Sequence, residues 1–208
     1  MHRLAPFRIL GVAALVTFAA TGCTTGPKLE AQWADPAFNA QSRLLQGQRV
    51  LIACDAYDTA VRQICQDRLA RGVLTKGATP VLVPAGTPLV QDRELDAQLI
   101  PTAQALGARA VLTVTMTPAT ASAGSGLSVG IGGFSFGRGG GAGVGLSAPI
   151  GGGEVNTGYA ASGRLTDVQE GRLVWAATHV ASPSSNLETQ FSELTQALLD
   201  SAQGAGMF

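Results

Sequence analysis

Short apolar runs alternate with helical stretches over residues 49–116, and this alternation limits the possible fold more than any other feature of the sequence. The runs 49–53, 79–83 and 110–116 are typical of buried strands. The stretches between them carry apolar residues at helical spacing, and Gly72 is expected to end the first. The second runs from about 92 to 106, and Pro101 is expected to kink or restart it. A β-α-β-α-β order requires crossover connections that pack the helices onto a sheet. The sequence therefore predicts an α/β domain.

Residues 155–208 are expected to add a hairpin and a last helix. Two runs with alternating apolar residues lie between positions 155 and 180 and flank a turn, which is a signal of a β-hairpin. Ser185 and Glu188 then have the spacing of a capping box at the start of a helix. Residues 47–208 are thus predicted to form one α/β (α+β) domain with a mixed sheet, in the order β-α-β-α-β, glycine-rich β-hairpin, β-β-α.

A glycine-rich insert occupies residues 122–153, which hold 14 of the 27 glycines and a single charged residue, Arg138. Apolar residues alternate along both halves of the insert, which predicts a β-hairpin with its tip at 137–141. In one interpretation the arms are transmembrane strands, and several subunits each donate a hairpin to a closed barrel. In the other, the hairpin lies on the surface of the domain or of a partner. Glycine and serine on the second face of the arms favour the surface interpretation.

The amino terminus has the pattern of a signal peptide. Arg3 and Arg8 precede an apolar run at 9–20, and small residues follow it. Twelve apolar residues are too few for a transmembrane helix, which needs roughly 20. Residues 1–22 are therefore predicted to be removed from the mature protein.

The four residues Ala20-Thr21-Gly22-Cys23 resemble the lipobox of bacterial lipoproteins, with alanine where leucine is usual. The resemblance implies that Cys23 is the mature amino terminus and carries lipid, so that the membrane is one partner. Thr24 stands where an aspartate would favour the inner membrane, which implies the outer membrane of a Gram-negative cell. Residues 23–46 are polar, contain two prolines and lack a sustained period, so they are predicted to be a flexible tether.

Composition excludes several classes of function. The formal net charge is zero, and no cluster of Lys and Arg occurs, although nucleic-acid binding requires one. We therefore expect no nucleic acid among the partners. The chain has only two histidines and three cysteines, so most metal and nucleophile chemistries lack the residues that they need. We expect no catalytic, metal or cofactor site, and the protein is predicted not to be an enzyme.

Three polar residues remain as candidates for a site, each with a simpler explanation. Asp55 and Asp58 follow the first strand, where open α/β sheets place ligand groups, but helix capping explains them equally well. His179 is the one histidine outside the signal peptide, and its place in an alternating strand predicts a surface or half-buried residue rather than a catalyst.

Two cysteines remain if lipid occupies Cys23. Cys54 lies at the end of the first strand, and Cys65 lies in the following helix. The periplasm is oxidising, so a disulfide between them is a reasonable expectation if their Cα atoms approach to about 5 to 6 Å. The alternative is a pair of buried free thiols.

Two sequence motifs carry a resemblance to a known group. Residues Gly163-Arg164-Leu165-Thr166-Asp167 and Gly171-Arg172-Leu173-Val174-Trp175, with the order of elements, resemble an uncharacterised family of bacterial periplasmic lipoproteins. That family is similar in architecture to the curli-secretion-channel lipoprotein and to lipoprotein activators of penicillin-binding proteins. The resemblance implies the fold and leaves the function open.

Together these features predict an outer-membrane lipoprotein that faces the periplasm. Its domain would be a non-catalytic interaction or assembly module, and its partner an envelope protein or further copies of itself. The alternative is an oligomeric pore-forming or secretion-associated lipoprotein that uses the glycine-rich hairpin.

Overall fold

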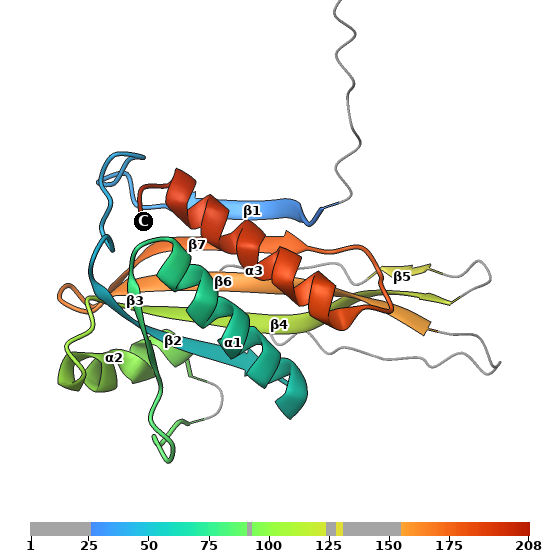
Figure 1. Ribbon diagram of the computed structural model, residues 1–208, viewed down its shortest axis with the longest axis horizontal. Helices are drawn as coiled ribbons and strands as arrows, with labels where there is room; N and C mark the ends of the chain where they lie inside the picture. Colours follow the sequence, from blue (N-terminus) through green and yellow to red (C-terminus); the bar gives the residue numbers. More distant parts are fainter. Residues whose placement is uncertain (1–25, 91–92, 124–127, 131–154) are drawn as a thin grey trace, which may run out of the picture.

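A computed structural model describes residues 26–90, 93–123, 128–130 and 155–208. It confirms the predicted fold class, because these residues form one mixed sheet with helices on both faces (Figure 1). The strand order is β1-β7-β6-β4-β2-β3, and β5 pairs with β4 beside this path. The sheet divides into a parallel half and an antiparallel half.

The parallel half contains the alternating part of the sequence. Strand β2 (Arg49–Ala56) lies between β3 (Thr79–Leu82) and β4 (Ala110–Ala123) and is parallel to both. Helix α1 (Thr59–Thr75) connects β2 to β3, and α2 (Leu95–Ala105) connects β3 to β4. The apolar runs mark β2 and β4 because side chains on both of their faces are covered by helices.

The antiparallel half extends from β4 to the far edge of the sheet. Strand β6 (Val155–Asp167) pairs with β4 and with β7 (Arg172–Val180), so the predicted hairpin is confirmed. Gly171 in its turn has a φ of 64°, a left-handed conformation that favours glycine. Strand β1 (Lys28–Ala34) pairs with β7 and completes the sheet.

The predicted tether is wrong from Lys28 onward, because this part of residues 23–46 belongs to the folded domain. Strand β1 is an edge strand, and Leu45 is fully buried. The backbone N–H of Leu45 donates to the carbonyl oxygen of Met207 over 2.7 Å, which attaches this segment to the C-terminus. The segment carries no apolar period because most side chains of an edge strand stay exposed, as five of the seven do in β1.

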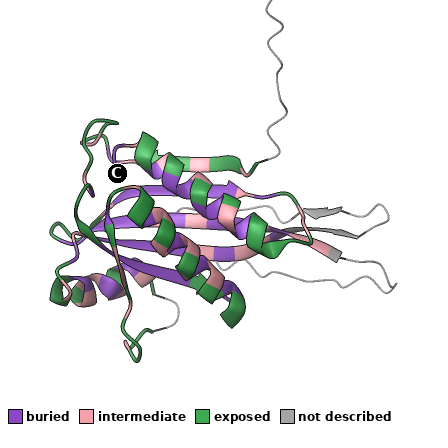
Figure 2. Ribbon diagram, in the orientation of Figure 1, coloured by how far each residue is buried: buried purple, intermediate pink, exposed green. Residues whose placement is uncertain are grey.

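Helices α1 and α3 (Leu187–Gly204) cover one face of the sheet and form the larger core (Figure 2). Its central members are Ile52, Cys65, Leu69, Leu112, Leu165, Trp175, Phe191, Leu194 and Leu198. The sequence predicted that Gly72 ends the first helix, yet α1 continues to Thr75. A side chain at Gly72 would collide with Leu199, so this glycine permits the close approach of α1 and α3.

Helix α2 covers part of the opposite face with a smaller core, whose fully buried members include Leu51, Leu99 and Val111. The sequence predicts a helix from about 92 that Pro101 kinks or restarts, whereas α2 begins at Leu95 and contains Pro101.

The capping box expected at Ser185 and Glu188 is also corrected. Asn186 is the N-cap residue of α3, and its side-chain oxygen accepts a hydrogen bond of 3.0 Å from the backbone N–H of Thr189. The side chain of Glu188 instead pairs with Arg68 of α1, and this long-range contact could not be seen in the local sequence pattern.

Strands β4 and β6 continue as a paired arm beyond the end of β2. Strand β2 ends where Ala56 pairs with Met116, whereas β4 and β6 stay paired as far as Ala123 and Val155 (Figure 1). The start of the glycine-rich insert differs from the prediction, because β5 (Ser128–Gly130) folds back onto β4. The predicted tip and return arm of the hairpin lie outside the described residues.

Candidate functional site

The two sequence motifs, at residues 163–167 and 171–175, contribute to the packing of the sheet against α3. A Cβ atom on Gly163 would lie 3.1 Å from the ring of Trp175 and 3.2 Å from Leu198. Glycine at this position of β6 therefore leaves room for the buried tryptophan beneath α3. Tryptophan and glycine thus form a matched pair from the two motifs, and their role is packing.

A buried carboxylate, which the sequence did not reveal, links α2 to β6. Asp96 is 4% exposed, and its Oδ2 accepts hydrogen bonds from the Thr166 hydroxyl at 2.5 Å and from the Arg164 guanidinium at 3.3 Å. Arg164 also pairs with Glu94 at 3.2 Å. The other carboxylate oxygen of Asp96 has no hydrogen-bond partner within the described residues. The spacing of Arg164 and Thr166, which places both on one strand face, was the available signal.

A second buried carboxylate stabilises the turn between β6 and β7. Asp167 is 1% exposed, and its Oδ2 accepts a 2.6 Å bond from Arg109. Its Oδ1 accepts bonds from the backbone N–H groups of Gln169 and Glu170 at 2.7 and 3.1 Å. The carboxylate therefore fixes the turn and ties it to the start of β4.

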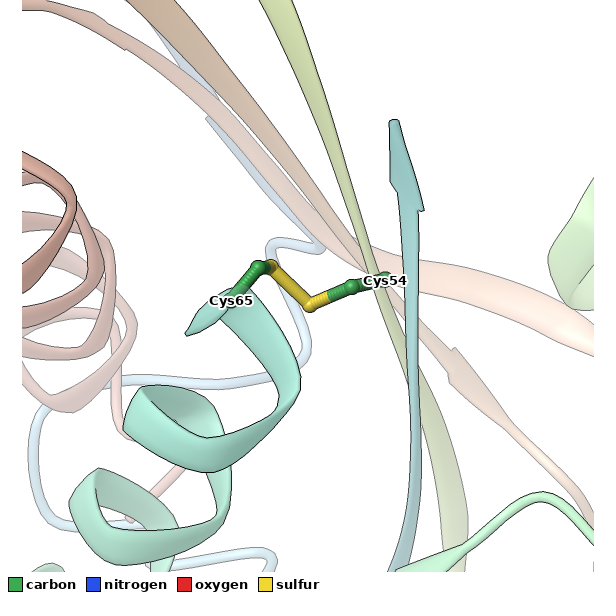
Figure 3. Close-up of a disulfide and its surroundings, with 2 residues drawn as sticks. All are labelled: Cys54 and Cys65. Atoms are coloured by element: carbon green, nitrogen blue, oxygen red, sulfur yellow. A yellow bond between two sulfur atoms is a disulfide. The ribbon is translucent and has the colours of Figure 1, made fainter. Parts of the chain in front are cut away.

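Cys54 and Cys65 form the expected disulfide between β2 and α1 (Figure 3). Their Cα atoms are 6.1 Å apart, which lies within the usual range for a disulfide. Both cysteines are buried under the larger core. The bond fixes the first turns of α1 against the sheet, and this position indicates a structural role.

The candidates Asp55 and Asp58, at the same end of β2, have different positions in the structure. Asp58 is the N-cap residue of α1, since its Oδ1 accepts bonds of 2.7 and 3.1 Å from the backbone N–H groups of Ala60 and Val61. Asp55 is exposed. Cys23, the expected lipid attachment site, lies outside the described residues.

His179 is buried, at 4% exposed, so the expectation of a surface or half-buried residue is wrong. Its Nε2 lies 3.1 Å from the hydroxyl of Ser201, which joins β7 to α3. Burial lowers the pKa of the imidazole below its usual value. The buried position arises because α3 covers the end of β7, and the strand pattern alone did not reveal this helix contact.

Trp175 is a buried member of the larger core, and Tyr159 packs against that core. The Tyr159 ring packs edge-on against Phe191 of α3, with ring centroids 4.9 Å apart. Burial, and then the negative charge of Asp58, raise the pKa of the Tyr159 hydroxyl. The phenol therefore stays neutral at physiological pH and serves packing.

A shallow groove lies between the outer sides of α1 and α3. Its lining includes Arg68 and Arg71 from α1, Lys76 at the C-cap of α1, and Asp200 from α3. Arg68 pairs with Glu188, and Lys76 lies beside Asp200, so these charges join the two helices. Across the described ranges, no three His, Cys, Asp or Glu side chains are grouped as metal ligands would be.

Strands β3 and β1, at the two ends of the strand order, differ in how far they are protected against pairing with another strand. In β3, the N–H of Thr79 donates to Gln48 at 2.8 Å, so strand alternation directs the nitrogen of Pro80 outward, where proline has no hydrogen to donate. Strand β1 has seven residues and no proline, and its protection is a bulge between Leu29 and Ala31. The β1 edge is therefore the more open of the two.

No family model matches the chain, and no curated protein matches it in sequence. No helix among the described ranges is long and apolar enough to cross a bilayer. Among solved structures, the lipoprotein GNA1162 from Neisseria meningitidis is 14% identical, with a TM-score of 0.41 over 74% of this chain and 99% of that chain. The PelC dodecamer from Paraburkholderia phytofirmans is 15% identical, with a TM-score of 0.52 over 86% of this chain and 98% of that chain. The chain therefore shares its fold with the PelC subunit.

Proposed function

We propose that this protein is an envelope lipoprotein, anchored through lipid on Cys23, whose folded domain is a non-catalytic module that assembles with copies of itself. The observation that carries the proposal is the shared fold with PelC, a protein that forms a dodecamer. The lipobox-like residues at 20–23 support the anchor, and Thr24 supports the outer membrane as its location. The expected partners are the membrane lipid and further subunits.

The side-chain chemistry agrees with a role in assembly. Asp96, Asp167 and His179 each make a hydrogen bond that joins two elements of the fold. The disulfide likewise fixes a helix to the sheet. These groups stabilise one rigid shape, which a subunit of an assembly requires. The open edge of β1 offers backbone groups that a neighbouring subunit can bind.

Crosslinking in intact cells tests the proposal. Cells that express the full chain are treated with a photoactivated crosslinker that does not depend on lysine, and the products are separated by mass. We expect a ladder at multiples of the subunit mass, and acyl groups on the mature amino terminus in mass spectrometry. The matched control is Cys23→Ser, which removes the lipid site and leaves the domain intact. A subunit that stays single in the cell, or that carries no lipid, would contradict the proposal.

A pore-forming or secretion-associated assembly is the second candidate. The arm of β4 and β6 favours it, because the paired strands give residues 122–153 a rigid base beyond the helices. Conductance across a planar bilayer separates the two candidates. Ion currents that disappear when residues 122–153 are replaced by a short turn would favour the pore, and a silent assembly would favour the first candidate.

A further inference from the structure

We propose that the end of the sheet that carries the β4–β6 arm faces the lipid surface, and that the β6–β7 turn faces away from it. The inference rests on the proposed lipid anchor at Cys23, and it adds an orientation to that anchor. The partner of this end of the domain is the membrane from which the chain itself emerges.

Strand register places the start of the folded domain at the base of the arm. Lys28, the first residue of β1, pairs with Val180, which pairs with Ala160, and Ala160 in turn pairs with Thr117 of β4. Four strands therefore share one level across the sheet. From this level β4 continues for six more residues to Ala123, which is about 20 Å at roughly 3.3 Å per residue.

The chain between the lipid site and this level is short. Cys23 and Lys28 are five residues apart, and a fully extended chain spans at most ~3.6 Å per residue, so the connection reaches about 18 Å. The opposite end of the sheet is further away. From Val180 to Arg172 β7 continues for eight residues, about 26 Å at roughly 3.3 Å per residue. If the strands run perpendicular to the membrane, the arm therefore lies near the membrane and the β6–β7 turn lies far from it. We call this arrangement upright.

Exposed apolar side chains favour the upright arrangement. Strand β2 ends at Ala56, which pairs with Met116 beside the same level, and the next residue, Tyr57, is fully exposed. Leu29 is 46% exposed one residue into β1, and Leu187 at the start of α3 is 37% exposed. Apolar and aromatic side chains are suited to the interface between water and lipid headgroups. At the opposite end, the β6–β7 turn residues Gln169 to Arg172 are polar or glycine, and Leu74 in the last turn of α1 is 63% exposed.

Energy transfer from a tryptophan introduced at either end of the sheet to the membrane tests the orientation. The full, lipidated chain with Trp33→Phe is the parent, since the buried Trp175 contributes equally in every variant. Tyr57→Trp places a donor at the level of the arm base, and Glu170→Trp places a matched donor in the β6–β7 turn. Both positions are exposed, so neither substitution disturbs the core. Each variant is reconstituted into phosphatidylethanolamine vesicles that contain a dansyl-headgroup lipid.

We expect transfer from position 57 to exceed transfer from position 170 several-fold. Equal transfer from both positions, or stronger transfer from position 170, would overturn the orientation while leaving the lipid anchor in place. The mass of the mature amino terminus is measured first on the same samples. A chain without acyl groups would overturn the anchor, and with it the proposed function, so the two failures are distinguishable.

Discussion

The two faces of the sheet are built differently, and the difference indicates which surfaces remain for partners. The face under α1 and α3 is a continuous apolar core with a disulfide, and two glycines there allow close packing. The face under α2 has a small apolar core, and the buried Asp96 attaches its helix to β6. The first face is closed by the fold itself. Contacts with other molecules are therefore expected at the β1 edge and at the arm.

The largest loss of stability should come from a substitution in the core under α1 and α3. Phe191→Ala is expected to lower the free energy of unfolding by about 3–5 kcal/mol, because it leaves a cavity beneath α3. Leu187→Ala, at an exposed position of the same helix, should change it by less than about 0.5 kcal/mol. Urea denaturation measures both, and similar losses at the two positions would contradict the account of this face.

Loss of the disulfide should rank second. The paired substitution Cys54→Ala and Cys65→Ala is expected to cost about 3 kcal/mol, since the bond closes a short loop in the unfolded chain. Denaturation of the oxidised parent with and without reductant gives the same comparison. If reduction leaves the midpoint of the parent unchanged, the bond does not contribute to the stability of this face.

A smaller loss is expected on the α2 face. Thr166→Val removes the hydroxyl that donates to Asp96, and it should cost about 1–3 kcal/mol because the acceptor is a buried carboxylate. Thr115→Val, at a half-buried threonine of β4, is the matched control. A control that loses as much stability as Thr166→Val would show that the Asp96 contact is not what attaches α2.

The smallest expected effect is the change in the free energy of unfolding with pH. It tests the contact of His179 with α3. Burial lowers the pKa of folded His179, so the unfolded state takes up the proton more readily as pH falls below about 6.5. The free energy of unfolding should therefore decline from pH 7.5 to pH 5.5. His179→Asn should reduce this decline, and an unchanged slope in that variant would refute the assignment of this pH dependence to His179.

The fold could be predicted where local patterns and burial coincide. Strands β2 and β4 are covered on both faces, so their apolar runs revealed them. Strand β1 could not be found in the same way, because an edge strand with mostly exposed side chains resembles a polar linker. The caps show the same limit. Asp55 and Asp58 were both predicted as caps, and Asp58 is the one that caps α1. Asn186 was missed because Ser185 and Glu188 have the spacing of a capping box, although Glu188 pairs with another helix.

The polar residues of the fold were harder to predict than its elements. The disulfide was confirmed, because both cysteines lie on adjacent elements of one βα unit. The spacing of Arg164 and Thr166 shows that they share a strand face, but it does not reveal that their partner is Asp96, 70 positions from Thr166. The burial of His179 likewise depends on a helix that follows β7 in the chain.

The most direct test of the account is the mass of the lipidated full chain, extracted in mild detergent and measured by light scattering. Self-assembly through the domain predicts a particle of many subunits. A variant chain in which residues 122–153 are replaced by a short turn shows whether the insert holds the particle together. A monomer at all concentrations would contradict the central claim that this domain assembles with copies of itself.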